Sequence, residues 1–331
     1  MKIDIEERVL HFKQPAGTSR GVYTTRRIWL VKVTDGERVD IGECAPLPQL
    51  SCDDIPNYAE VLRQFCDEVE RSGEIPYDKL RNYPSMLFGL ETAIHPLPFP
   101  KEGARAIPIN GLVWMGSHDE MLQRMEEKLE QGFRCVKLKI GAIDFDHELD
   151  LIKRIRSRFS HHEVELRVDA NGAFPFEEAL YKLELLSQYN IHSIEQPIRA
   201  GQWAYMAELC RESPLPIALD EELIGVNDPD QKRQMLNIIK PRYIILKPSL
   251  HGGMAGTREW VETANDMQIG SWITSALESN IGLYAIARLC LSIYGDHITM
   301  PQGLGTGQLF TDNIPMPLEI RGDKLWISTN S

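Results

Sequence analysis

The chain has 331 residues, of which 43% are hydrophobic, and its 36 Lys and Arg residues against 48 Asp and Glu residues give a net charge of −12. This length suits one barrel-sized domain with a smaller companion, and an acidic balance without a basic block argues against nucleic acid or an anionic membrane as a partner. Residues 1–6 alternate as a strand does, no apolar run reaches transmembrane length, and six cysteines are scattered along the chain, so we expect a cytoplasmic protein.

Residues 1–105 have the pattern of an α+β capping domain. Alternating segments around the turn at 35–36 predict an antiparallel meander, and helical spacing follows at 55–72 and 85–94. A polar stretch at 15–24, which includes Arg20, is predicted to be a loop, and a lid over a neighbouring site and a plain surface loop are equally open interpretations. Prolines at 96, 98 and 100 mark the end of this domain.

From residue 106 to 310 the pattern is a strand followed by a helix, repeated. Candidate strands occupy 107–112, 135–140, 164–169, 191–196, 216–220, 243–247, 271–275 and 298–301. Seven helical segments separate them, and glycines rather than a long helix follow the last strand. This count predicts a (β/α)7β modified TIM barrel. The tail, 311–331, has one strand signal and is predicted to return to the capping domain.

Three acidic residues end three successive apolar runs of the predicted barrel. Asp169, Glu195 and Asp220 follow one another at spacings of 26 and 25 residues, about the length of one βαβ unit. An acid at a strand end is also a common helix N-cap, but three at a repeated spacing favour a shared site. Oxygen ligands of this kind suit Mg²⁺, with Mn²⁺ as the alternative. Arg167 and Asn171, two residues before and after Asp169, are expected to point into the same space.

Three lysines come from strands on either side of these acids. Lys137 and Lys139 lie on one face of the second barrel strand, and Lys247 ends the sixth. A solvated charge is not expected on an internal parallel strand, and two like charges are expected to lower a lysine pKa toward the range of a general base. A metal held by carboxylates, with a lysine base, would support proton abstraction next to a substrate carboxylate.

The motifs, in this order and spacing, resemble the enolase superfamily, in its muconate-lactonizing-enzyme subgroup. They are Lys-x-Lys at 137–139, Asp-x-Asn at 169–171, Glu-Gln-Pro at 195–197, Asp-Glu at 220–221 and Lys-Pro at 247–248. The resemblance covers essentially the whole chain, including 42–48, 88–93 and 275–283. It implies that Asp169, Glu195 and Asp220 bind Mg²⁺, that Lys139 is the base and that Lys247 lies on the opposite face.

Within the subgroup, residues 42–48 and 303–310 are most similar to the o-succinylbenzoate synthase family. That resemblance implies a lyase of menaquinone biosynthesis, which dehydrates a small cyclohexadiene carboxylate to an aromatic product. Contacts to substrate or support for the site are expected from Lys137, Arg167, Asn171, Ser275 and Arg20. The chain departs from common subgroup patterns at Glu222 and His251. The glycine run at 303–307 opens no helical pattern, so we reject a phosphate loop.

Other activities of the same fold remain open. An N-acylamino acid racemase or a dipeptide epimerase would use Lys139 and Lys247 as paired acid and base, although the eighth strand lacks an Asp-x-Asp motif. A cycloisomerase would use the same groups. Outside the superfamily, a Schiff-base aldolase would use Lys247 alone, and a non-catalytic scaffold would have no use for these residues. The sequence does not decide whether the protein forms a homo-oligomer.

Overall fold

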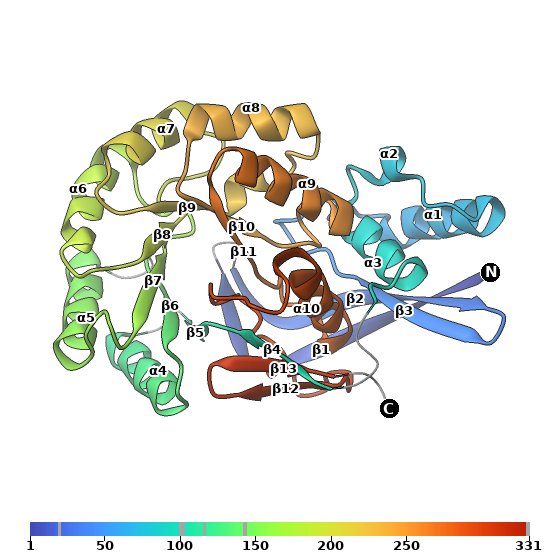
Figure 1. Ribbon diagram of the computed structural model, residues 1–331, viewed down its shortest axis with the longest axis horizontal. Coiled ribbons are helices and arrows are strands. Elements are labelled where there is room, and N and C mark those ends of the chain that lie inside the picture. The colour runs from blue at the N-terminus through green and yellow to red at the C-terminus, as the bar shows by residue number, and fades with distance from the viewer. Residues whose placement is uncertain (19–20, 99–102, 115–116, 142–143, 329–331) are drawn as a thin grey trace.

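The computed structural model describes residues 1–18, 21–98, 103–114, 117–141 and 144–328. An antiparallel sheet with three helices forms a cap, and a ring of parallel strands surrounded by helices forms the larger lobe (Figure 1). Among the described residues, no helix is long and apolar enough to cross a membrane.

The cap is built from three strands and three helices. In chain order these are β1 (Lys2–Thr18), β2 (Gly21–Asp35), β3 (Arg38–Cys44), α1 (Tyr58–Ser72), α2 (Tyr77–Leu80) and α3 (Pro84–Ile94). The strands are antiparallel in the order β1-β2-β3. Apolar and polar residues alternate along the strands, so one face of this sheet is apolar. On that face Val31 and Val33 pack against Leu62 of α1 and Leu90 of α3.

Strand β1 and strand β2 extend into the stretch that was predicted to be a loop. Ala16 pairs with Tyr23 and Gly17 with Val22, after a register shift that begins beyond His11. The loop prediction for 15–24 is therefore wrong for most of that stretch. Pro15 is tolerated because it lies in the register shift between His11 and Ala16, where β1 has no paired residue on β2. Arg20 lies outside the described residues.

The barrel strands form one parallel sheet in the order β11-β10-β9-β8-β7-β6-β5. They are β5 (Gly111–Val113), β6 (Cys135–Lys139), β7 (Glu165–Asp169), β8 (Ser193–Glu195), β9 (Ile217–Leu219), β10 (Tyr243–Leu246) and β11 (Gly270–Ile273). Helices follow them along the outside (Figure 1): α4 (His118–Glu130), α5 (Phe145–Arg158), α6 (Phe176–Ser187), α7 (Trp203–Glu212), α8 (Pro229–Ile239), α9 (Gly253–Asp266) and α10 (Asn280–Tyr294). Local signals set their starts: Ser117 and Glu120 form a capping box, and Asp228 caps α8 ahead of Pro229.

Residues 302 and 303 close the barrel where an eighth strand was predicted. Gln302 forms a parallel bridge with Ile109, and Gly303 forms one with Thr274, so the two edges of the sheet are joined. The prediction of a regular strand at 298–301 is wrong, because the pairing is confined to these two bridges. The described residues contain seven barrel helices, α4 to α10, and the architecture is the predicted (β/α)7β barrel with an α+β cap.

The C-terminal tail forms a third small sheet. Strands β12 (Leu318–Arg321) and β13 (Lys324–Ile327) are antiparallel, and β13 pairs with β4 (Arg105–Pro108) rather than with the cap sheet. The tail first contacts the cap, because the backbone N–H of Thr311 donates to the carbonyl of His11. The division into 1–105, 106–310 and 311–331 stays a prediction.

Buried polar groups join the cap to the C-terminal ends of the barrel strands. Glu43 of β3 accepts hydrogen bonds from the backbone N–H groups of Ser279 and Gly282, each at 2.8 Å. Arg26 of β2 is buried and donates to the carbonyl oxygens of Ala45, Pro46 and Leu277. Because such desolvated groups lose their partners if the lobes separate, the cap is fixed over that end of the barrel.

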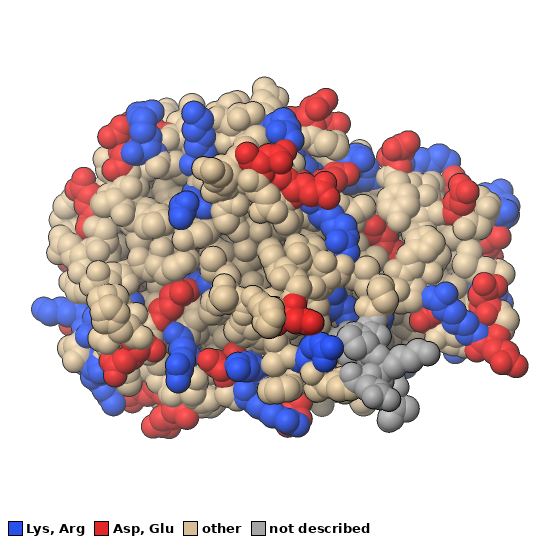
Figure 2. All heavy atoms as spheres, viewed as in Figure 1, with Lys and Arg blue, Asp and Glu red and all other residues tan. Residues whose placement is uncertain are grey.

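Charged side chains of both signs intermingle around the rim of the face shown in Figure 2, and its centre is largely neutral. No broad basic patch covers the described part of this face. The lack of a basic patch on the described part of this face is consistent with the net charge of −12.

Candidate active site

Strand register brings the predicted site residues to one level of the barrel. Lys139 of β6 pairs with Asp169 of β7, which pairs with Glu195 of β8. Asp220 directly follows β9, and Lys247 directly follows β10. Because the strands are parallel, all five side chains lie at the C-terminal end of the barrel, where active sites of this fold are built.

Two lysines lie against the three predicted metal ligands. The Lys137 Nζ is 3.0 Å from Oδ2 of Asp169 and 2.8 Å from Oε2 of Glu195. On the other side of the group, the Lys247 Nζ pairs with Oδ2 of Asp220. These contacts are buried, since the three carboxylate residues are at most 3% exposed. The structure therefore brings the three predicted carboxylates together with lysines from β6 and from the end of β10, as expected.

Lys139 has a different set of partners. Its Nζ donates to Oδ1 of Asn171 at 2.6 Å and lies 3.3 Å from Oδ2 of Asp169. The Nδ2 of Asn171 in turn donates to Oε1 of Glu221 at 2.9 Å. The Lys139 ammonium also lies 6.0 Å from the ring centroid of Trp114. Asn171 and Glu221 thus form a hydrogen-bonded chain that fixes the direction of the Lys139 side chain.

The carboxylates differ in their pKa values. Burial and the neighbouring charge of Asp169 raise the pKa of Glu195 to about 8, although Lys137 opposes this. Burial also raises the pKa of Asp220, against the effect of Lys247. Burial acts upward on Asp169 too, but the lysine charges outweigh it and hold the pKa of Asp169 below its usual range. Asp169 is therefore the most readily ionised of the three.

The lysine environment reverses one prediction. Burial lowers the pKa of Lys137, but the charges of Asp169 and Glu195 outweigh burial and raise it. The expectation that like charges lower a lysine pKa is therefore wrong for Lys137, because anions lie closer to it than other cations do. The charge of Asp220 likewise raises the pKa of Lys247 above its usual value despite burial. Both groups are ammonium ions at neutral pH.

The site supplies oxygen donors of the kind that a divalent cation needs. Oε1 of Glu195, Oδ1 of Asp220 and Oε2 of Glu221 are buried and have no hydrogen-bond partner among the described residues. A buried unpaired carboxylate oxygen is costly, and coordination to a hard cation would satisfy it. Within the described ranges, no group of three His, Cys, Asp or Glu side chains has metal-site geometry, and the Lys137 and Lys247 ammonium groups contact these carboxylates instead.

Three of the weaker predictions have other outcomes. Arg167 points into the barrel, but it contacts Glu165 at 2.7 Å, the carbonyl of Pro301 at 2.9 Å and the ring of Trp272. No contact between Arg167 and the three carboxylates is found among the described residues. Ser275 is buried and shares a hydrogen bond with Thr306. Neither contact indicates a substrate role, and Arg20 lies outside the described residues.

Comparison with known proteins identifies the family. Residues 120–329 match the family model for enolase C-terminal domain-like proteins, and residues 18–97 match the model for the MenC N-terminal domain. The chain is 42% identical to o-succinylbenzoate synthase from Desulfotalea psychrophila, with 99% of each chain covered. The chain belongs to the o-succinylbenzoate synthase family of the enolase superfamily.

A solved structure and a more distant relative are also similar to this chain. A crystal structure of MenC from Desulfotalea psychrophila matches with a TM-score of 0.82 and 39% identity, over 98% of this chain and 99% of that one. N-succinylamino acid racemase from Thermus thermophilus is 31% identical over 166 residues, covering 50% of this chain and 42% of the relative. Members of the enolase superfamily bind a divalent metal, typically Mg²⁺.

Four residues of this family member were not predicted as site residues. Glu221 accepts the hydrogen bond from Asn171, which in turn contacts Lys139, and the Trp114 ring lies beside the Lys139 ammonium group. The Nδ1 of His251 accepts the backbone N–H of Lys247 at 2.9 Å, and Glu222 accepts a 3.0 Å hydrogen bond from Gln196. One signal was available, because the acidic run at 220–222 directly follows a strand. Only the first acid of that run was assigned a role.

Proposed function

We propose that this chain is an o-succinylbenzoate synthase. In this proposal it catalyses the Mg²⁺-dependent dehydration of 2-succinyl-6-hydroxy-2,4-cyclohexadiene-1-carboxylate to 2-succinylbenzoate, a step of menaquinone biosynthesis. The full-length identity of 42% supports the substrate assignment. The observation that carries the chemistry is the arrangement of Lys139 and Lys247, which reach one level of the barrel from strands on opposite sides of buried carboxylates.

Asp169, Glu195 and Asp220 are the proposed ligands of the metal. Their buried, partly unpaired oxygens support this role. When bound, a divalent cation would stabilise the negative charge that develops on the substrate carboxylate. In this proposal the cation takes the place of the Lys137 and Lys247 ammonium groups at the carboxylate oxygens that they contact. Lys137 would still lie close enough to reduce the net negative charge of the site.

Lys139 is the proposed base. In its neutral amine form, it takes the proton from the ring carbon that bears the carboxylate, and the electron pair of that C–H bond moves into the carboxylate to give an enediolate. The ammonium of Lys139 then returns this proton to the neighbouring hydroxyl group. The C–O bond breaks, water leaves and the ring becomes aromatic. Asn171 and Glu221 support this role because they hold the Lys139 Nζ in one direction.

Lys247 is proposed to act as a cation rather than as a base. A lysine side chain is a cation at neutral pH, and the position of Lys247 on the opposite side from Lys139 would place a positive charge beside the planar intermediate. A cation there favours the anionic enediolate over the neutral ring that precedes it.

The test is ultraviolet-monitored dehydration of the cyclohexadiene substrate by the purified chain, with Mg²⁺ and with EDTA. We expect metal-dependent turnover, its complete loss in Lys139→Ala, and partial retention in Lys247→Arg but not in Lys247→Ala. Lys153→Ala, an exposed lysine on α5, is the matched control and should keep the full rate. Thermal melting establishes that each variant is folded. A folded Lys139→Ala or Lys247→Ala protein that keeps the full rate with Mg²⁺ would refute the proposal.

Racemisation of N-acylamino acids is the second candidate activity. Two lysines on opposite sides of one site suit proton removal from one face and return to the other, and the match to an N-succinylamino acid racemase supports the same chemistry. Incubation of an N-succinyl amino acid in D2O would show deuterium at the α-carbon if this activity is present. Absence of exchange, with turnover of the cyclohexadiene intact, would remove this candidate.

We also propose a cytoplasmic location and a small carboxylate as the sole substrate class. All six cysteines are free thiols, which fits a reducing compartment. Fractionation of cells that express the chain would test the location.

A further inference from the structure

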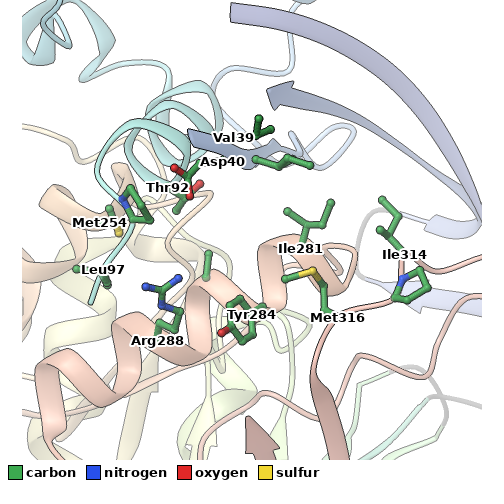
Figure 3. Close-up of a pocket in the computed structure, with 14 residues that line it drawn as sticks. Val39, Asp40, Thr92, Leu97, Met254, Ile281, Tyr284, Arg288, Ile314 and Met316 are labelled. Carbon is green, nitrogen blue, oxygen red and sulfur yellow. The ribbon is translucent and has the colours of Figure 1, made fainter. Parts of the chain in front are cut away.

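A cleft lies between the cap and the outside of the barrel. Its volume is about 310 Å³, and it is bounded by β3, the C-terminal end of α3, one side of α10 and residues 314–316 (Figure 3). None of the lysines and carboxylates of the candidate active site lines it. The volume falls at the lower end of the range that small-molecule sites occupy.

The walls of this cleft are mainly apolar. Ile281 and Tyr284 of α10 are buried on one side, and Met254 is buried at the start of α9. Val39 and Ile41 of β3 line the opposite side and remain exposed at 50% and 44%. Figure 3 shows the labelled side chains of Val39, Met254, Ile281 and Tyr284 around a common space, which they reach from β3, α9 and α10. An apolar body of limited size would be desolvated there on both sides.

Arg288 is the charged group of this cleft that lacks a partner. Its Nε is buried and has no hydrogen-bond partner, and among the described residues its guanidinium forms no ion pair. Its contact is with the ring of Tyr284, 5.5 Å from the guanidinium carbon to the ring centroid. Burial lowers the pKa of Arg288, and the charges of Tyr284 and Asp40 act in the opposite direction. Asp40, the nearby acid, is already paired with Arg38.

We propose that this cleft binds a small amphipathic monocarboxylate, with its carboxylate on Arg288 and its apolar body against Tyr284, Ile281 and Met254. A planar carboxylate matches the Nε and Nη donors of a guanidinium. A phosphate dianion suits the cleft less well, because it would meet one arginine and the charge of Asp40. The apolar body is an aromatic ring system or a medium-length alkyl chain. Both kinds of ligand carry the same carboxylate, and both bodies fit the same apolar walls.

The experiment is a ligand-observed NMR titration of the full chain with 2-naphthoate and octanoate, and with the neutral 2-naphthamide and octanamide. We expect at least one of the carboxylates to bind with a dissociation constant on the order of 1 mM, and the matching amide at least tenfold more weakly. The tighter of the two carboxylates identifies an aromatic or an alkyl body.

Two variants locate the binding. Arg288→Gln should weaken carboxylate binding by about tenfold or more, while Arg211→Gln, an exposed arginine of α7, should leave it unchanged. Ala285→Phe, which fills the cleft from α10, should abolish binding of carboxylate and amide alike. Turnover of the cyclohexadiene is expected to persist in all three, so this proposal and the proposed function fail separately.

Three results would overturn the proposal. Equal binding of carboxylate and amide would show that Arg288 is not the anchor. Full carboxylate binding by Ala285→Phe would place the ligand elsewhere, including the active site, which also attracts carboxylates. No binding of either carboxylate at about 20 mM, well above the affinity that such a cleft should give, would show that the cleft is not a ligand site.

Discussion

The chain from Glu221 through Asn171 to Lys139 gives a sharp prediction about catalysis. Asn171→Gly removes the acceptor that lies 2.6 Å from the Lys139 Nζ. Asn171 has a positive φ of 45°, which glycine adopts without strain, so the backbone should not move. A hydrogen bond to a charged group contributes about 1.5–3 kcal/mol. If that free energy positions the base, kcat for dehydration should fall by roughly 10- to 150-fold.

Steady-state kinetics with the cyclohexadiene substrate at saturating Mg²⁺ is the measurement, and KM should change much less than kcat because Lys139 is the base. Glu221→Gln should cause a smaller loss, because a rotated amide still accepts from Asn171. Glu221→Leu, which cannot accept, should approach the rate of Asn171→Gly. An Asn171→Gly enzyme that melts normally and loses less than about threefold in kcat would show that the chain does not position Lys139.

Three other predictions concern the metal and stability. Glu195→Gln should weaken Mg²⁺ binding by about tenfold or more in calorimetry, since it removes one anionic donor; unchanged affinity would exclude Glu195 as a ligand. Burial raises the pKa of Asp53 from 3.8 to about 6, so the folded state holds this proton more tightly than the unfolded state does. Asp53 should therefore lower the free energy of unfolding as pH rises from about 4 to 6, by up to about 3 kcal/mol, and urea titrations should show that decline reduced in Asp53→Asn. An equal dependence of the unfolding free energy on pH in the wild-type and Asp53→Asn proteins would contradict this role of Asp53. A Cβ added at Gly42 would lie 1.9 Å from the carbonyl oxygen of Gly89, so Gly42→Ala should lower the melting temperature by about 2–6 °C, and an unchanged melting curve would show that β3 and α3 separate easily.

The repeated part of the fold was readable from the sequence because each unit carries its own signals. Buried parallel strands are short apolar runs, and an acid at the end of each run marks where the strand meets the site. Non-local pairing was not readable in the same way. The extension of β1 past Pro15 and the pairing of β13 with β4 depend on which edges are open, and no local pattern encodes that.

The positions of Lys137 and Arg167 show why strand period gives a direction but not a contact. These two residues are paired across β6 and β7, and both point into the barrel. Their level lies two residues, about 7 Å, below that of Asp169. The flexible Lys137 side chain extends up to the carboxylates, whereas the Arg167 guanidinium stacks 4.4 Å from the Trp272 ring and stays at its own level. Two inward-pointing cations on adjacent strands thus have different surroundings. The difference comes from Trp272 and Pro301, which approach from the far side of the barrel and are more than 100 residues away in the sequence.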